Sequence, residues 1–407
     1  MREKNWRNKY NILVPQADSL GAVAAIRSLG EHGYTVFAAS VKKEALGCQS
    51  TFTHASTSCP NYDDGYVTWL RDYIAQHSIS AIVPSEGFLL AIQNDYEEFQ
   101  HLLPLSPQQP AIYLCLCKVD VFDAFLAANE NKVQKNIPKT QIVTSSKEVH
   151  QSISQWEFPL FIKGDAFYVK DAPPSGFVGF ANTLEEAREM VTQQLYHYEK
   201  VLVQECFQGE KVTVNLLNWQ GSDIAESMVL ASHQNPHTGG LMSLRKSWWH
   251  EGIYQDALAR RNFLGWHGAA MFEYKWNSET DTFCFIEINS RYWGALNLDI
   301  LAGIHFPCYQ MDAFLEGLLP QKTIRLTKEI VVRNTLPADF GYALSRLKDK
   351  KLTLSQKGYT FIEFFLLFLH PSIKSDLLYP NDRKLYFINL WAFIKDFTQS
   401  CLKWLKK

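Results

Sequence analysis

Two strand-like stretches of the sequence carry the residues best suited to metal and phosphate chemistry. Residues 269–275 and 283–289 are rich in apolar and aromatic residues, and the short polar segment between them has the composition of a turn. The pattern predicts an antiparallel hairpin in which Glu273 lies opposite Glu287. Asn289 then points to the same face as Glu287, because side chains alternate along a strand. The hairpin would therefore gather two carboxylates and an amide on one face.

Opposed carboxylates need a positive charge between them, because they would lie about 5 Å apart. Mg²⁺ takes oxygen ligands from one or two carboxylates and leaves its other positions to phosphate and water. Arg291 follows where the chain leaves the second strand, and a guanidinium there can neutralise phosphoryl oxygens. We therefore predict a metal site at Glu273, Glu287 and Asn289 beside a catalytic Arg291. The alternative for the carboxylates, a solvated acidic hairpin, is disfavoured by the apolar residues around them. For Arg291 taken by itself, a surface salt bridge stays equally open.

A parallel sheet is predicted for the first hundred residues, where strand and helix signals alternate. The expected strands are residues 11–15, 35–39 and 81–84, and the expected helices are residues 22–29, 67–77 and 88–99. Strands separated by helices of this length form parallel sheets with right-handed crossovers. Ligands of such sheets bind at the carboxyl ends of the strands, here near residues 16–21 and 85–87.

An α+β unit is predicted after Cys117, where helical and antiparallel signals are mixed. The expected strands are residues 141–143, 159–164, 201–204, 211–217, 224–231, 269–275 and 283–288, and the expected helices are residues 119–131, 146–156 and one ending near 198. Residues 171–176 have the composition of a flexible turn. We interpret the apolar run that holds Cys115 and Cys117 as the core of a strand rather than a zinc site, because the chain has no C-x-x-C pair.

Composition limits the classes of function. The 407 residues suffice for two or three domains, and the contents of 46% hydrophobic and 20% charged residues are those of an ordinary globular protein. A formal net charge of -2 argues against a dedicated nucleic-acid binder. The eight cysteines are scattered, which indicates reduced thiols and hence a cytoplasmic protein.

The last ninety residues are the least informative part of the sequence. The longest apolar stretch, residues 361–369, is interrupted by Glu363 and is too short to span a bilayer. Residues 390–407 are basic and amphipathic, and we expect a packed core helix there, with a helix on a membrane surface as the alternative. This region would either close over a substrate pocket or form a surface for a homodimer.

The string FIEINSRYWG at residues 285–294, continued by AGIHFP at residues 302–307, resembles the signature of ATP-grasp enzymes. The likeness is greatest to the carbamoyl-phosphate-synthase-like and carboxylate–amine ligase branch. In that family an acidic or amide residue on the preceding strand and an E-x-N-x-R motif hold two Mg²⁺ ions and the ATP phosphates. Glu273, Glu287, Asn289 and Arg291 match this pattern in type and spacing.

The resemblance implies a domain organisation. Residues 1–113 would form a parallel α/β pre-ATP-grasp domain and residues 114–317 the ATP-grasp domain, followed by a C-terminal extension at residues 318–407. The ATP-grasp domain would divide into a first subdomain, residues 114–198, with phosphate-binding lysines and a flap, and a second, residues 199–317, with the hinge and the metal site. The motifs are readable over about residues 114–310.

The resemblance also implies nucleotide-binding residues. Lys118 and Lys163 resemble the two phosphate-contacting lysines, although Cys117 precedes Lys118 where the family commonly has aspartate. The loop at residues 171–179 resembles the flap over the phosphates, but it carries two prolines. The hinge that grips adenine would be formed by Gln204, Glu205, Cys206 and Phe207. Lys211 stands where a ribose-binding glutamate is usual, so Glu210 either takes that contact or the contact is altered.

A further basic segment lies at residues 237–246. Its two glycines permit a tight loop, and in related ligases a comparable stretch faces the acceptor substrate and the γ-phosphate. We predict that Arg245 is a second catalytic arginine, while the resemblance leaves His237 open between the site and an exposed loop.

The function implied is that of an ADP-forming ligase that uses ATP and two Mg²⁺ ions, for which Mn²⁺ can substitute. A substrate carboxylate would be activated as an acylphosphate and then attacked by an amine, with both substrates small molecules. Two alternatives stay open. One is a carboxylase-type ATP-grasp enzyme that uses bicarbonate, and the other is a degenerate ATP-binding module with a regulatory role.

Overall fold

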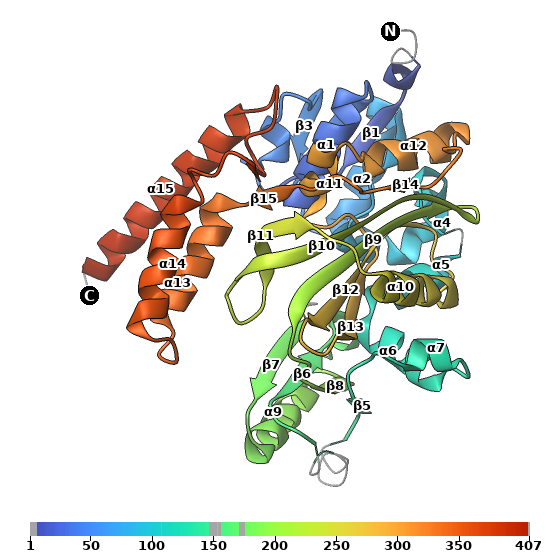
Figure 1. Ribbon diagram of the computed structural model, residues 1–407. Helices are drawn as coiled ribbons and strands as arrows, with labels where there is room; N and C mark the ends of the chain where they lie inside the picture. The colour runs from blue at the N-terminus through green and yellow to red at the C-terminus, as the bar shows by residue number, and fades with distance from the viewer. Residues whose placement is uncertain (1–5, 107, 146–152, 154–155, 171–175, 406–407) are drawn as a thin grey trace.

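Three β-sheets and a group of C-terminal helices make up the protein (Figure 1). The computed structural model describes residues 6–106, 108–145, 153, 156–170 and 176–405. In Figure 1 the parallel sheet lies at the top, the small antiparallel sheet at the bottom and the large sheet between them. Most of the helix predicted at residues 146–156 and of the turn predicted at residues 171–176 lies outside the described residues.

The N-terminal sheet is parallel throughout, with the strand order β3-β2-β1-β4. Its elements are β1 (Asn11–Val14), α1 (Leu20–Glu31), β2 (Thr35–Ser40), β3 (Ala55–Ser58), α2 (Asp64–His77), β4 (Ile79–Ile82), α3 (Glu86–Ala91) and α4 (Tyr96–Phe99). The predicted parallel sheet is confirmed. The single helix predicted at residues 88–99 is wrong, because the polar Gln93–Asp95 form a 3-10 turn that separates α3 from α4.

The small sheet is antiparallel, with the strand order β5-β8-β6-β7. Its elements are β5 (Thr140–Val143), β6 (Leu160–Gly164), β7 (Phe177–Ala181), α9 (Leu184–His197) and β8 (Val201–Glu205). Ala187 and Val191 of α9 belong to the same apolar core as Leu160 and Ile162 of β6. Residues of β6 alternate between the two faces, so Lys163 points away from this core.

A run of short helices precedes the small sheet. It consists of α5 (Gln109–Leu116), α6 (Lys118–Ala127) and α7 (Asn131–Gln134). Cys115 lies in α5, so our interpretation of this run as a strand is wrong, and Pro110 in the first turn of α5 fits the start of a helix. Cys115 and Cys117 are buried, and burial raises the pKa of the Cys115 thiol to about 12. The seven cysteines whose side chains are described are free thiols.

The large sheet has eight strands in the order β13-β12-β9-β10-β11-β15-β16, with β14 paired to β10. The elements from the predicted second subdomain are β9 (Glu210–Trp219), β10 (Ser222–Asn235), β11 (Leu241–Ser247), α10 (Glu251–Phe263), β12 (Gly268–Asn277), β13 (Thr282–Asn289), α11 (Leu296–Ala302) and α12 (Phe306–Glu316). The α11 helix ends at Gly303, whose φ of 98° is the left-handed conformation that glycine adopts without strain.

The predicted C-terminal extension completes the large sheet and adds three helices. Its elements are β14 (Ile324–Arg325), β15 (Val331–Arg333), α13 (Phe340–Lys348), α14 (Leu354–Leu366), β16 (Ile373–Ser375) and α15 (Lys384–Leu405). Most described side chains from Trp391 onward are exposed, so the expectation of a packed core helix there is wrong. Within the described residues, no helix is long and apolar enough to cross a membrane. The domain boundaries after residues 113 and 317 stay a prediction.

Candidate active site

The hairpin of β12 and β13 has the predicted register, with Glu273 paired to Glu287. The ladder contains a β-bulge, because Tyr274 pairs with Phe285 and Ile286 is the extra residue between the two pairs. The bulge lets Phe285 enter the core, where it is fully buried, while Glu287 remains on the opposite face beside Glu273. The two carboxylates are therefore brought together as the sequence predicts.

Each carboxylate of this pair has its own lysine. Lys118 Nζ lies 2.6 Å from Glu287 Oε2, and Lys211 Nζ lies 2.8 Å from Glu273 Oε2. Lys118 is the first residue of α6, whereas Lys211 comes from β9, the neighbour of β12 in the sheet. The positive charge that opposed carboxylates require is thus supplied by two ammonium groups, so the opposition alone does not demand a metal ion.

A line of polar contacts leads from Glu287 toward the parallel sheet. Asn289 Nδ2 donates to Glu287 Oε1 at 3.0 Å, and Arg291 Nη2 donates to Asn289 Oδ1 at 3.1 Å. Arg291 Nε also lies 3.4 Å from Glu86 Oε2 at the start of α3. The structure therefore brings Glu287, Asn289 and Arg291 together and joins them to Glu86, beside residue 85, where the parallel sheet is expected to present ligands.

The helix α1 closes the site from the side of the parallel sheet. A Cβ atom on Gly21 would lie 3.0 Å from the carbonyl oxygen of Trp293 and 3.2 Å from that of Tyr292. Glycine therefore allows the first turn of α1 to rest on the chain that follows Arg291. This contact fixes the exit of β13, and with it the position of Arg291.

The pairing gives the two carboxylates different acidities. Burial by itself would raise the pKa of Glu287, but the Lys118 ammonium and the hydrogen bond from Asn289 hold it below its usual range. The pKa of Glu273 is raised, because burial and the charge of Glu287 outweigh the attraction of Lys211. Glu287 is therefore the stronger acid and holds its negative charge over the wider pH range.

Lys163 faces the same site from the small sheet. Its Nζ donates to Gln204 Oε1 at 2.7 Å, and Gln204 Nε2 donates to Thr140 Oγ1 at 2.9 Å. Burial and the nearby Lys118 ammonium lower the pKa of Lys163 to about 8. Gln204 is buried, and its side-chain oxygen holds the ammonium group of Lys163 in place. This residue of the predicted hinge therefore contacts a lysine of the site through its side chain.

A cavity lies between the small sheet and the helices α3 and α6. Its lining includes Glu86, Lys118, Lys163, Asp165 and Gly176. Both predicted phosphate-binding lysines thus line one cavity. Of the predicted flap, residues 171–175 are outside the described residues. Gly176 precedes β7, and residues 177–179 form the beginning of that strand.

Asp165 is a site residue that the sequence reasoning did not select. Its Oδ2 accepts a hydrogen bond from the backbone N–H of Lys118 at 2.7 Å, and its Oδ1 accepts one from the N–H of Phe167 at 3.1 Å. The carboxylate therefore caps the first turn of α6 and ties it to the end of β6. The feature of the sequence that could have identified Asp165 is its position two residues after Lys163.

The predicted adenine hinge is partly occupied by the protein's own backbone. The N–H of Glu205 donates to the carbonyl of Lys139, and the N–H of Cys206 donates to the carbonyl of Pro159. The side chain of Glu205 lies 3.4 Å from Lys139 Nζ. Phe207 is the hinge residue whose N–H has no partner among the described residues. If this hinge binds adenine through a backbone N–H, the N–H of Phe207 is therefore the one that would donate to the base.

Glu210 is not brought together with the other site residues. It is exposed and pairs with Trp276, on the face of the sheet opposite Lys211. Lys211 instead points to Glu273 and also donates to the carbonyl of Gly240 at 3.0 Å. Lys211, which stands where the family commonly has a ribose-binding glutamate, therefore contacts the hairpin carboxylate Glu273, while ribose binding by Glu210 stays a prediction.

Arg245 lies in a strand and not in the predicted loop. It belongs to β11, it is buried, and its Nη1 and Nη2 donate to Asp376 Oδ2 and Oδ1 at 2.9 and 2.5 Å. Only the turn before the strand, which includes His237, has the predicted loop conformation. The segment is a strand where the glycines suggested a loop, because β11 pairs with β10 on one side and with β15 on the other. A catalytic role for Arg245 stays a prediction.

His237 lies at the C-terminal helices. Its Nδ1 is 2.9 Å from Ser345 Oγ, and its Nε2 is 2.9 Å from Asp349 Oδ2. These contacts hold the turn between β10 and β11 against the end of α13. The structure therefore does not bring His237 together with the hairpin carboxylates.

The residues of the hairpin fit a divalent cation. Glu273 and Glu287 present carboxylate oxygens on one face together with the amide of Asn289, and these are ligands that Mg²⁺ accepts. Thr213 pairs with Glu273 across the sheet, and its buried Oγ1 has no hydrogen-bond partner among the described residues. An orphaned hydroxyl beside the carboxylates is expected where a bound group completes the polar network.

A second group of potential metal ligands lies elsewhere. Among the described residues, ligand atoms of Glu31, His32 and His305 lie within 4.8 Å of one another. This group is at the C-terminal end of α1, whereas Gly21 at its N-terminal end contacts the candidate site. Glu31 Oε2 accepts a hydrogen bond from the hydroxyl of Tyr379 at 2.5 Å. The carboxylate of Glu31 therefore holds the C-terminal segment, through Tyr379, against the end of α1.

Solved structures share the fold of this chain. No family model and no curated protein matches the chain. N5-carboxyaminoimidazole synthetase from Staphylococcus aureus matches with a TM-score of 0.63 and 16% identity, over 83% of this chain and 84% of that chain. L-amino acid ligase from Bacillus licheniformis matches with a TM-score of 0.57 and 13% identity, over 75% of this chain and 74% of that chain.

A carboxylase domain also shares the fold. The biotin carboxylase domain of Hydrogenobacter thermophilus 2-oxoglutarate carboxylase, a dimer in complex with MgADP, ADP and bicarbonate, matches with a TM-score of 0.59 and 15% identity. The match covers 79% of this chain and 73% of that chain. At these identities the likeness is one of fold. It confirms the predicted fold class.

Proposed function

We propose that this chain, which has the ATP-grasp fold, is an ADP-forming ligase that activates a small-molecule carboxylate for attack by an amine. The observation that carries the proposal is that the hairpin carboxylates and the two lysines predicted to bind phosphate lie at one place. Glu287 contacts Lys118, and Lys118 lines one cavity with Lys163. A ligase that transfers a phosphoryl group needs carboxylates for the cation and ammonium groups for the phosphates at one place.

In the proposed reaction, a substrate carboxylate oxygen attacks the γ-phosphorus of ATP, and the bond to the β,γ-bridging oxygen breaks to release ADP. The amine nitrogen then attacks the carbonyl carbon of the acylphosphate. The carbon–oxygen bond to phosphate breaks, inorganic phosphate leaves, and the nitrogen loses a proton. The reaction needs no protein nucleophile, because the phosphoryl and acyl groups pass between the substrates.

Named residues would serve each step by charge and position. Glu273, Glu287 and Asn289 would hold Mg²⁺, which when bound neutralises phosphate oxygens as a Lewis acid. Lys163 and Lys118 would contact the phosphates from the cavity, and Arg291 would stabilise the charge of the transferring group. The neighbour in complex with MgADP supports this choice of nucleotide and ion.

The first test removes the charge of Glu287. We expect Glu287→Gln to lower ADP formation roughly a hundredfold or more, because a neutral amide would hold Mg²⁺ more weakly and the charge stabilisation that the ion supplies would be lost. ADP release is measured with Mg·ATP against a panel of carboxylates and amines, with mass spectrometry of the product. Glu279→Gln is the matched control, because Glu279 is exposed in the turn of the same hairpin. Full activity of a folded Glu287→Gln variant would contradict the proposal.

The same panel separates the alternative activities. Bicarbonate is included among the acids, so ADP formation that depends on bicarbonate would identify the carboxylase-type reaction. One observation favours a regulatory module. Lys211 forms an ion pair with Glu273, so the carboxylate already has a positive partner where a cation would bind. Binding of ATP without turnover of any acid and amine would support that module.

A further inference from the structure

The C-terminal lobe, defined here as α13, α14 and α15 with their connections, exposes an unusual amount of apolar surface. Of the twenty-two large apolar side chains that are exposed in the described residues, fourteen lie between residues 354 and 402. Trp391 is 71% exposed and Leu369 is 78% exposed. A surface of this kind, concentrated in a small part of the chain, marks an interaction site.

The exposed side chains follow helical stripes. On α14 and the turn after it, Phe361, Phe365 and Leu369 recur every four residues. On α15, Phe387, Trp391 and Ile394 recur at intervals of four and three. Such spacing places each set on one face of its helix. Both helices are therefore apolar on a face that the protein leaves in water.

These stripes are not the faces by which the helices pack on the protein. Phe340 of α13 makes edge-to-face contacts with Phe364 of α14 and with Phe393 of α15. The packed face of each helix is thus filled by other aromatic residues, and the exposed stripes form a second apolar face. Figure 1 shows α13, α14 and α15 gathered at one side of the molecule.

In the C-terminal lobe most acidic side chains point inward, whereas most basic side chains are exposed. Four of the five acidic residues from position 340 to 402 point inward, to partners that include His237 for Asp349, Arg245 for Asp376 and Arg27 for Asp382. Asp396 is the exposed acidic side chain in this range. Seven lysines and arginines in the same range are exposed, and Lys384 and Lys395 belong to α15. The surface of the lobe is therefore both apolar and cationic.

We propose that the C-terminal lobe binds the surface of a bilayer that contains anionic lipid, with its apolar stripes in the headgroup region. Amphipathic helices with aromatic residues on one face and lysines beside them lie in this region. Anionic headgroups attract the exposed lysines, with about 1 kcal/mol for each one near the surface. A second copy of the chain is a poorer occupant, because an isologous contact would set two cationic surfaces against each other.

The test measures binding of the full chain to vesicles by co-sedimentation. Vesicles of phosphatidylcholine alone are compared with vesicles of phosphatidylcholine and phosphatidylglycerol. We expect binding to the anionic vesicles that weakens as salt rises, and at least roughly tenfold weaker binding to neutral ones. Trp391→Glu and Phe365→Glu should each abolish the binding without lowering the melting temperature, because both side chains are exposed.

A matched control shows whether the loss of vesicle binding is specific to the C-terminal lobe or follows from any exposed aromatic residue being replaced by glutamate. Tyr196 on α9 is 74% exposed and lies outside the lobe, so Tyr196→Glu should leave vesicle binding unchanged. Lack of vesicle binding by the wild-type chain would overturn the proposal, and so would equal binding to neutral and anionic vesicles. Light scattering of the eluted protein adds a further outcome. A dimer that Trp391→Glu dissociates, without vesicle binding, would assign the stripes to a second copy.

Discussion

At the scale of single residues, the site is defined by which lysine pairs with which carboxylate. Glu287 has Lys118 and Glu273 has Lys211, so both acids are neutralised by the chain itself. For a cation to bind, it must compete with or share these partners. The Lys118 pair leaves Glu287 strongly acidic, whereas burial and Glu287 raise the pKa of Glu273. A cation is therefore expected to meet less competition from protons at Glu287.

Lys163 gives a prediction in pH. Its pKa of about 8 means that the ammonium is charged below pH 8 and neutral above it in the free protein. Phosphate binding favours the charged form, so above pH 8 ATP must bind together with a proton. We expect the Kd for ATP to rise about tenfold per pH unit above 8. Calorimetric titrations from pH 6.5 upward measure this slope, and Lys163→Arg, which keeps its charge, should remove it. A flat wild-type profile would contradict the role of Lys163.

Lys211 gives a prediction on metal binding. Replacing it by methionine leaves the buried carboxylate of Glu273 without its counter-ion beside Glu287, which should destabilise the protein by about 3 kcal/mol. If Glu273 binds Mg²⁺, the ion should replace the lost charge. We expect Mg²⁺ to raise the melting temperature of Lys211→Met more than that of the wild type. Equal Mg²⁺ effects on the two proteins would argue against a metal at Glu273.

At the scale of elements, the hairpin depends on a bulge that pattern reading does not reveal. The pairing of Glu273 with Glu287 requires the extra residue Ile286, because Tyr274 already pairs with Phe285. Without it, Phe285 and Glu287 would share one face of β13. The core needs the aromatic ring on one side and the site needs the carboxylate on the other. The bulge satisfies both demands.

The pairing of β11 with the C-terminal extension supplies a prediction about Arg245. Two of its guanidinium nitrogens donate to Asp376, which follows β16. If the pair is structural, Asp376→Asn and Arg245→Met should both destabilise the protein by about 3 to 5 kcal/mol and should lower turnover only as far as folding is lost. Urea unfolding and ADP release at low temperature measure the two effects. A loss of turnover that is confined to Arg245→Met would instead support the predicted catalytic role.

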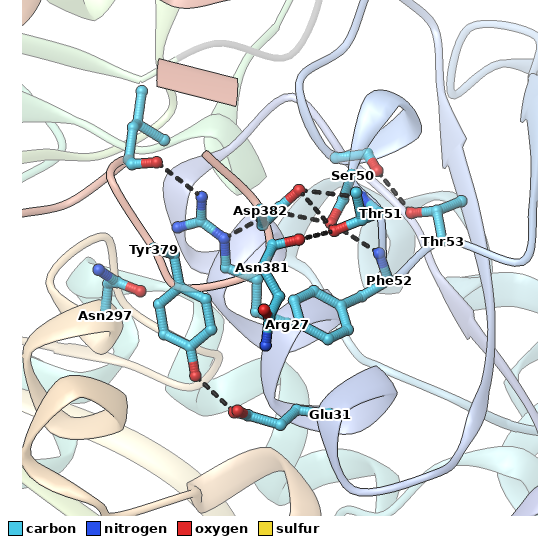
Figure 2. Close-up of polar contacts among 12 residues, drawn as sticks. Arg27, Glu31, Ser50, Thr51, Phe52, Thr53, Asn297, Tyr379, Asn381 and Asp382 are labelled. Carbon is cyan, nitrogen blue, oxygen red and sulfur yellow. Dashed lines mark hydrogen bonds and ion pairs between the residues drawn. The ribbon is translucent and has the colours of Figure 1, made fainter. Parts of the chain in front are cut away.

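At the scale of the whole molecule, the C-terminal segment binds back onto the N-terminal part of the chain, at α1 and the loop before β3. Figure 2 shows Asp382 among Arg27, Ser50 and Thr51, and Tyr379 directed at Glu31. Asp382 accepts hydrogen bonds from Arg27 Nε and Ser50 Oγ, both at 2.9 Å. Chain positions more than three hundred residues apart are thus fixed to each other. The segment before α15 anchors the lobe to the rest of the protein.

The anchor makes Asp382 a strong point of stability. Both partners of its ion pair with Arg27 are almost fully buried. We expect Asp382→Asn to lower the free energy of unfolding by about 3 to 5 kcal/mol, because the guanidinium is left buried without its partner. Denaturant titration measures the change. Asp396→Asn is the matched control on the exposed face of α15 and should change stability little. Equal stabilities of the two variants would show that the anchor is dispensable.

The sequence by itself determined the parallel sheet and the two strands of the hairpin, because strand alternation and turn composition are local properties. The pairing of Glu273 with Glu287 was predicted correctly, but the bulge that produces it was not. Lys118 and Lys163 could be selected only through the resemblance to a known family. The tertiary structure alone decided that Lys211 neutralises Glu273, that Asp376 engages Arg245 and that His237 meets Asp349.

These partners join distant parts of the chain, and sequence spacing carries no information about such contacts. The same reason explains the wrong expectation for α15. Its amphipathic pattern shows that one face is apolar, but whether that face packs or stays in water depends on the elements that surround it. Only the folded chain decides which apolar faces find a partner.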